Sequence, residues 1–324
     1  MTAALGGMVA LFGHDPATYI PHPVHDGSHV YHETDCYTDI VIELLHARGD
    51  EPLAALASFV RGDFEGDQFT FFKPWPSDLE TLFGVDIHEM QPYRPLPDQI
   101  AELLGSGRTA IVELDAWYLP DTFATSYRTE HVKTSVAAEA IDPERGVFRY
   151  YHNTSLHELG GDDFRGAFRI GLDLPGDVLP PYTEIVRFDA GPRLTGAAVR
   201  AEARRQLRYH LDRRPATDPF TRFGERLAAD MPTLLDGDDA GYHAYAFATV
   251  RMAGAGFELC AAHVDWLLGA DGAPTVAALG RIVDGSKTLG FRLARRRPFD
   301  VEAATGPLSE TWHEAMATLD RALA

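Results

Sequence analysis

The sequence predicts an α+β protein that ends in a helical bundle. Three observations support this fold class. A helical pattern with a cysteine in its first turn spans residues 34–49, and β-branched runs joined by a turn lie between residues 109 and 151. From Leu194 onward the chain is rich in apolar residues at helical spacing. We therefore expect a domain with an antiparallel sheet, followed by a domain made of helices.

The segment 34–49 indicates a helix that begins near a cysteine. Thr34 or Asp35 can cap this helix, because either side chain can accept from the free N–H groups of the first turn. Gly49 ends it, as glycine does where a chain leaves a helix through positive φ. The helix dipole at this position favours an anion, and the thiolate is the reactive form of a cysteine, so Cys36 is a candidate nucleophile. The alternative is a small buried hydrophobic residue, which is what most free cysteines are.

Composition excludes several classes of function. The chain has 324 residues and a net charge of −19, which argues against nucleic acid as a partner, because phosphates need a basic surface. Its two cysteines are too few for a disulfide framework. The apolar first residues lack a basic n-region, and no run approaches the ~20 apolar residues of a membrane helix. We expect a cytoplasmic protein.

Residues 13–33 form a loop that contains five histidines, namely His14, His22, His25, His29 and His32. Histidine is the commonest metal ligand, so a zinc site with Asp26 or Cys36 is one interpretation. The spacings match no closed zinc motif, and we expect no metal. His29 and His32 precede Cys36 closely enough to line the same pocket.

A second informative block follows at residues 109–153. We expect strands at 109–114, 132–141 and 147–151, with a turn at 142–146 that contains Pro143 and Gly146. Antiparallel strands place the start of one near the end of the next, so His131 and Asn153 should be neighbours. An amide that orients a histidine ring supplies the base that a cysteine nucleophile needs. The alternative is that His131 is an exposed strand end and Asn153 a turn residue, with no catalytic role.

The run of residues 110–153 resembles a block of the butirosin H-type acyltransferases. In that family an Asp and a "YLP" element follow a strand, and a histidine then opens the next hydrophobic strand. These are papain-like proteins that move an acyl group from a carrier-protein thioester onto an amine. Over most of its length the chain also resembles an uncharacterised bacterial family often found beside amino acid:carrier protein ligases. The stretches "TDCYTD" and "HN…LHEL" carry that second resemblance.

The resemblance implies a papain-like fold, with an N-terminal helix packed on an antiparallel sheet, and a Cys36–His131–Asn153 catalytic set. It places Asp115 and Tyr118 near the pocket, and the residues around the cysteine that we expect to contact substrate are His32, Thr34 and Tyr37. Papain-like enzymes usually carry a glutamine before the cysteine, and no glutamine precedes Cys36 here. His29, His32 or Thr34 could take its place beside the Cys36 N–H. The third member, Asn153, is an amide, whereas the carrier-protein branch of the family has an acid at this place. Asp142 is a rival candidate for the role of orienting the histidine.

The remaining sequence predicts the domain boundary and the second domain. Residues 160–192 are rich in Gly, Pro and Asp, so we expect a catalytic domain at 1–192 and a helical domain at 193–324. A helix at 197–214 carries six arginines, which offer either a docking surface for an acidic carrier protein or a solvated face with internal ion pairs. Residues 239–268 form a long apolar helix, whose small central residues allow close packing and in which Cys260 is inert core.

The resulting functional hypothesis is a cysteine acyltransferase that moves an aminoacyl group from a carrier-protein thioester to a small amine acceptor. No bound cofactor is implied, because the acyl group arrives on the phosphopantetheine arm of the carrier protein. A cysteine peptidase or amidase would use the same residues, and a catalytically silent carrier-protein-binding protein would keep the scaffold alone. The sequence does not separate these three.

Overall fold

The computed structural model describes residues 3–5, 7–31, 33–171 and 178–324 and forms two compact units. The first unit contains the large sheet and consists of Met1–Pro23, Cys36–Pro52 and Leu79–Leu194. The second contains the long helices and consists of Val24–Asp35, Leu53–Asp78 and Thr195–Ala324. Two N-terminal segments, Val24–Asp35 and Leu53–Asp78, therefore belong to the helical unit. A single division of the chain after residue 192 would place both in the first domain.

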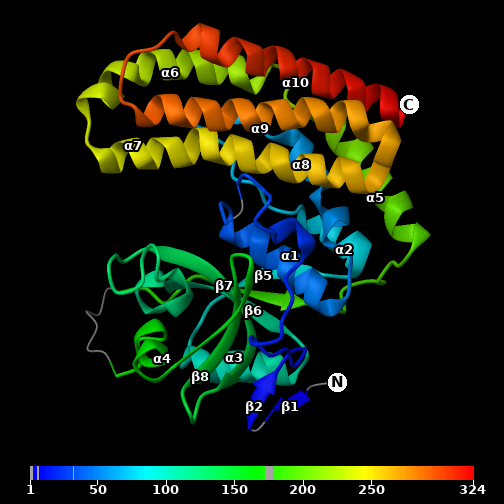
Figure 1. The fold of residues 1–324 in the computed structure, drawn as a ribbon. Coiled ribbons are helices and arrows are strands. Elements are labelled where there is room, and N and C mark those ends of the chain that lie inside the picture. The colour runs from blue at the N-terminus through cyan, green and yellow to red at the C-terminus, as the bar shows by residue number, and fades with distance from the viewer. Residues whose placement is uncertain (1–2, 6, 32, 172–177) are drawn as a thin grey trace. The chain divides into compact units, whose positions relative to one another are not determined.

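One antiparallel sheet organises the first unit (Figure 1). Its order is β1-β2-β7-β6-β10-β5, with β8 on β7 and β9 on β8. The ladder with β8 covers one edge of β7, while β6 and β2 share its other edge, each along one half of the strand. The bounds of these strands are β1 (Ala3–Leu5), β2 (Met8–Ala10), β5 (Asp86–Met90), β6 (Thr109–Asp115), β7 (Lys133–Asp142), β8 (Val147–His152), β9 (Ser155–Gly160) and β10 (Thr183–Arg187).

The three strands predicted between residues 109 and 151 are confirmed as β6, β7 and β8. The β7–β8 turn closes at Gly146, whose φ of +65° is a conformation that glycine adopts without strain. A bulge between Ala138 and Ala140 interrupts the ladder with β8. The α+β class and the helical C-terminal part are confirmed as well.

Helices cover the sheet of the first unit, and α1 (Cys36–Arg48) packs on β7 and β8. The helix ends as predicted, because Gly49 follows it with a φ of +80°. The other helices of this unit are α3 (Leu96–Gly105), which packs on β2, β6 and β7, and α4 (Gly161–Ala167), which packs on β8 and β9. The residues of α2 (Pro76–Phe83) are divided between the two units.

The two faces of β8 bury different side chains, because residues alternate along a strand. Tyr151 faces α1: its hydroxyl lies 3.1 Å from Glu139 Oε2 and its ring 5.5 Å from that of Tyr19, which hydrogen-bonds Glu43 of α1. Phe148 faces the other way, with its ring 5.1 Å from that of Phe168 just beyond α4. The sheet therefore has a packed layer on each side, and α1 occupies one of them.

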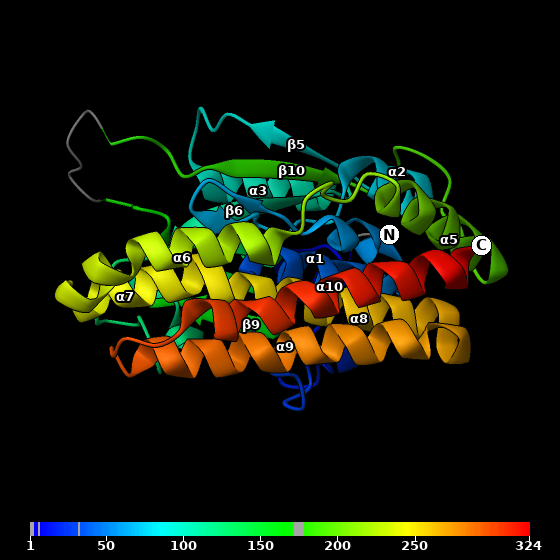
Figure 2. The same ribbon diagram turned by 90° about the horizontal axis from the view of Figure 1, so that it is seen from above.

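The second unit is a helical bundle with a small hairpin. In it α9 packs against α8 and α10, and α10 packs against α6; Figure 2 shows these helices side by side. No helix in the described part of the chain has an apolar stretch long enough to cross a bilayer. The elements of this unit are β3 (Phe64–Glu65), β4 (Gln68–Phe69), α5 (Ala197–Leu211), α6 (Pro219–Asp236), α7 (Asp239–Ala246), α8 (Met252–Leu268), α9 (Ala273–Ala294) and α10 (Val301–Leu323).

The predicted long helix at 239–268 is divided into α7 and α8 by a π-helical turn at Phe247–Arg251. The small residues at the start of α8 do permit close packing, but the neighbours are aromatic rings. A Cβ on Gly254 would lie 2.1 Å from Tyr31 Cε2, and one on Gly256 would lie 1.9 Å from Phe72 Cε2. Both rings come from the N-terminal segments that belong to this unit.

The arginines of the predicted basic helix are engaged within the chain. Arg208 and Arg214 both contact Asp320, with N–O distances of 2.6 and 2.9 Å. The others donate to Trp266 O (Arg200), Ala322 O (Arg204), Glu202 (Arg205) and Tyr209 O (Arg213). This arrangement fits a solvated face with internal ion pairs better than a free basic surface.

The segment that leads to Cys36 is held by Glu258 of α8. The backbone N–H groups of Val30 and Tyr31 donate to its two carboxylate oxygens, each at 2.8 Å. The hydrogen bond with Glu258 raises the pKa of His29, against the effect of burial. One histidine of the N-terminal group thus contributes to an internal ion pair.

His263 makes the stability of the second unit depend on pH. It is fully buried on α8, and its Nδ1 lies 2.7 Å from Leu53 O. Burial lowers the pKa of His263 to about 4, with a further contribution from His210. Between pH 6.5 and 4 the unfolded chain therefore binds more protons than the folded chain. Lowering the pH through this window should reduce the free energy of unfolding by about 3 kcal/mol.

We expect His263→Asn, which keeps an N–H donor for Leu53 O, to flatten this pH dependence. His313→Asn removes an exposed histidine of α10 and should leave it unchanged. Urea unfolding at pH 7 and pH 4.5 for the three proteins measures the effect. If the free energy of unfolding changes equally between the two pH values in the wild type and in His263→Asn, the assignment is contradicted.

Candidate active site

Cys36 is the first residue of α1. Cys36 is half-buried, whereas Cys260 is buried and burial raises the pKa of that thiol to about 12. The free backbone N–H groups of the first helical turn can receive an anion at this position. Asp35, which directly precedes the helix, is buried. The structure confirms that a helix begins at Cys36, and the role of this residue as a nucleophile stays a prediction.

His131 and Asp115 form the principal side-chain pair of this region. His131 Nδ1 lies 2.6 Å from Asp115 Oδ2, while Asp115 Oδ1 accepts from the backbone N–H of Trp117 at 3.0 Å. The indole ring of Trp117 stacks on the imidazole, with centroids 4.5 Å apart and planes 11° apart. These contacts fix the ring and direct Nε2 away from the carboxylate, where it can take up or give a proton. The imidazole side chain is 66% exposed, so reactants can reach it.

The predicted contact between His131 and Asn153 is wrong. The register pairs Ala137 with Tyr151, so two steps along each strand bring Ser135, not His131, opposite Asn153. Asn153 lies instead in the β8–β9 turn with a φ of +47°, and among the described residues no hydrogen bond joins it to His131. The physical reason is that β7 is ten residues long and β8 only six, so β8 ends well short of the start of β7. Asp142, the rival orienter, accepts from Arg145 N in the β7–β8 turn.

Among the described residues no side-chain hydrogen bond joins the Cys36 thiol to His131 or to Asp115. A pocket of about 320 Å³ lies beside the imidazole and is lined by both members of the pair, by Lys133 and by Tyr182, but not by Cys36. The pocket leaves room for a small chemical group beside the imidazole.

The predicted substrate-binding residues have varied surroundings. Tyr118 packs on Gly166 and lies under the Arg128 guanidinium, 5.3 Å from the ring centroid. Tyr37 is half-buried in the first turn of α1. Thr34 is buried, and its hydroxyl has no hydrogen-bond partner in the described part of the chain. His32 lies outside the described residues.

Comparison with known proteins identifies the family. The DUF1839 N-terminal domain matches residues 20–188, and the DUF1839 C-terminal domain matches residues 196–321. The chain belongs to the DUF1839 family. The N-terminal match contains Cys36, Asp115 and His131. No curated protein matches the chain.

A buried network in this DUF1839 chain was missed by the sequence analysis. His152 bonds Asp121 through Nδ1 and lies 2.8 Å from Thr134 Oγ1 through Nε2, while Tyr150 also donates to Asp121. Burial raises the pKa of Asp121, but the hydrogen bond and charge of His152 outweigh it and hold that pKa below its ordinary value. His152 is only 1% exposed, so the network anchors the loop after β6 to β8 rather than meeting a substrate. The "LPD" and "YYHN" runs, each with a polar residue beside apolar ones, were the available signal.

Proposed function

We propose that this DUF1839 protein is a cysteine-dependent acyltransferase built on a papain-like first unit. In this proposal it moves an aminoacyl group from a carrier-protein thioester to a small amine. The observation that carries the proposal is the fixed His131–Asp115 pair, 2.6 Å apart, in the same compact unit as the helix that begins with Cys36. The resemblance to the butirosin H-type enzymes supports the choice of substrate.

In the proposed reaction the Cys36 thiolate attacks the thioester carbonyl and forms an acyl-enzyme. The thiol of the carrier protein leaves with a proton from His131. The amine then attacks the acyl-enzyme, and His131 removes its proton. The new amide is released, and Cys36 returns to the thiolate form. Asp115 takes the orienting role first given to Asn153, because its carboxylate holds the ring through Nδ1 and favours the imidazolium. Backbone N–H groups at the start of α1 would receive the oxyanion.

Hydrolysis is the second candidate function. The exposed imidazole of His131 admits water as readily as an amine, which favours a peptidase or amidase that uses the same residues. Comparing the rates of hydrolysis and aminolysis for one thioester distinguishes the two reactions. A predominance of aminolysis at millimolar amine supports the transferase.

The proposal predicts an acyl-enzyme on Cys36. Incubation with an aminoacyl carrier protein should add one aminoacyl mass to the wild-type chain and none to Cys36→Ala, because the remaining thiol, Cys260, is buried. Cys260→Ala is the matched control and should keep the adduct, since its thiol is buried. Intact-protein mass spectrometry measures both. An adduct that persists in Cys36→Ala rejects the assignment.

A further inference from the structure

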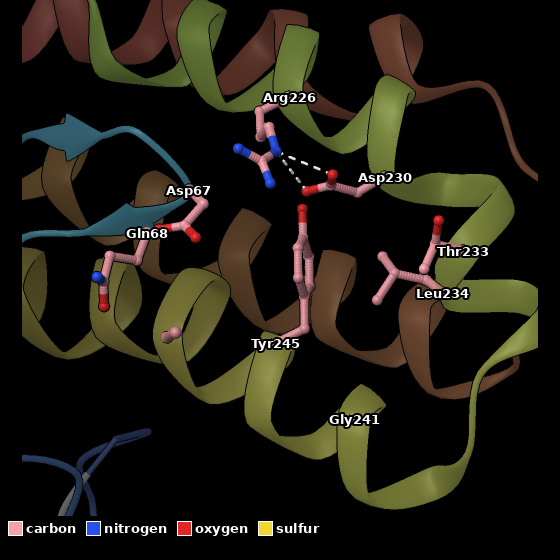
Figure 3. Close-up of a pocket in the computed structure, with 9 residues that line it drawn as sticks. Asp67, Gln68, Arg226, Asp230, Thr233, Leu234, Gly241 and Tyr245 are labelled. Atoms are coloured by element: carbon pink, nitrogen blue, oxygen red, sulfur yellow. Dashed lines mark hydrogen bonds and ion pairs between the residues drawn. The ribbon is translucent and has the colours of Figure 1, made fainter.

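The helical unit contains a cavity that has no part in the proposed reaction. It has a volume of about 400 Å³, within the range typical of small-molecule sites. Figure 3 shows three elements around it: the tip of the β3–β4 hairpin, one face of α6, and α7 with the π-helical turn. All of these elements belong to the second compact unit.

The only guanidinium that lines this cavity is already neutralised. Arg226 Nε donates to both carboxylate oxygens of Asp230, at 2.9 and 2.8 Å, and Nη1 donates to Gly66 O at 3.4 Å. Figure 3 shows this pair at one side of the cavity. A paired guanidinium attracts an anion weakly, so the cavity does not favour an anionic ligand.

Two further polar groups of the lining are the Asp67 carboxylate and the Tyr245 hydroxyl. Asp67, at the hairpin tip, is exposed, and the described part of the chain provides no ion-pair partner for its carboxylate. The Tyr245 hydroxyl is buried and points toward the Asp230 carboxylate (Figure 3). Burial and the Asp230 carboxylate raise the pKa of Tyr245, so its hydroxyl stays protonated at neutral pH. The lining therefore holds two carboxylates against one guanidinium, together with a phenol hydroxyl beside one of the carboxylates.

The backbone beside the cavity is irregular. The π-helical turn at Phe247–Arg251 begins two residues after Tyr245, and Ala248 within it lines the cavity. Such turns are rare in helices and occur frequently at functional sites. Leu234 and Ala248 add an apolar wall next to the acceptors.

We propose that this cavity binds a small primary ammonium compound. The ammonium group would pair with the Asp67 carboxylate, and its other N–H donors can share the lone pairs of Asp230 and of the Tyr245 oxygen. An alkyl portion of the ligand would lie against Leu234 and Ala248. The net negative lining and the acidic chain as a whole attract a cation. This inference does not depend on the acyltransferase proposal, and its test requires no carrier protein.

The test measures binding of n-butylammonium to the full chain by calorimetric titration. Two probes serve as controls: n-butyltrimethylammonium has the charge and chain but no N–H donor, and butyrate has the opposite charge. We expect saturable binding of butylammonium, about tenfold weaker binding of the trimethyl probe, and none of butyrate.

Variants assign the binding to the cavity. Asp67→Asn should weaken butylammonium about tenfold without changing the Tm of the ligand-free protein, because the carboxylate is exposed and unpaired. Asp271→Asn removes an equal charge from an exposed position in a 3₁₀ helix of the same unit and should have no effect. The proposal is overturned if butylammonium does not bind, if the trimethyl probe binds equally well, or if the two variants weaken binding equally.

Discussion

Asp115→Asn is expected to lower the rate of acyl-enzyme formation about a thousandfold, with little change in stability. The carboxylate accepts the Nδ1 proton of His131 and so keeps Nε2 available as the base. An asparagine in its place removes the charge that favours the imidazolium. Its amide can also donate to Nδ1, which selects the wrong tautomer. Single-turnover measurement of the aminoacyl adduct gives the rate, and urea unfolding of the same protein checks the fold.

Asn153→Gly is the matched variant. Glycine retains the positive φ of the β8–β9 turn and removes only the side-chain amide, so the turn should keep its geometry. The rate should stay within about twofold of the wild type, because the amide does not reach His131. If Asn153→Gly loses the activity and Asp115→Asn retains it, the set predicted from the sequence is right and the role we give to Asp115 is wrong.

The sequence predicted Asn153 as the partner of His131, and the structure has Asp115 in that place. This outcome shows how far the site could be predicted from the sequence. The strands, the turn at Gly146 and the helix that begins at Cys36 followed from local patterns, and the structure confirms them. The partner of His131 depended on the register and relative lengths of two strands, which local patterns do not specify. Asp115 ends β6, the other neighbour of β7, and its contact with His131 follows only when that pairing is known.

The sequence also did not predict that N-terminal segments pack with the C-terminal helices, because local patterns do not specify contacts between distant segments. Apolar periodicity identified the C-terminal helices, but it does not tell which distant segments pack against them. Tyr31 and Phe72 lie far from α8 in sequence, and their rings occupy the space that Gly254 and Gly256 leave open. Small residues in a helix predict a close neighbour without naming it. The identity of that neighbour is a tertiary property.

Gly256→Ala is expected to destabilise the second unit by about 3 kcal/mol. The added methyl group would lie 1.9 Å from Phe72 Cε2 and 2.1 Å from Cζ, so the ring must move. The ring has little room, because Phe72 is buried and stacks on Phe59, with centroids 5.1 Å apart. The higher helix propensity of alanine offsets less than about 1 kcal/mol of this cost. Denaturant unfolding followed by circular dichroism measures the change.

Gly280→Ala supplies the control for that measurement. Gly280 is in α9 of the same unit, and a Cβ there would meet nothing within 4 Å. The substitution should therefore stabilise the protein by about 0.5–1 kcal/mol through helix propensity alone. Combining Gly256→Ala with Phe72→Leu should recover part of the lost stability, since the smaller side chain vacates the space of the ring edge. If Gly256→Ala is as stable as Gly280→Ala, Phe72 does not pack against α8 as the structure has it.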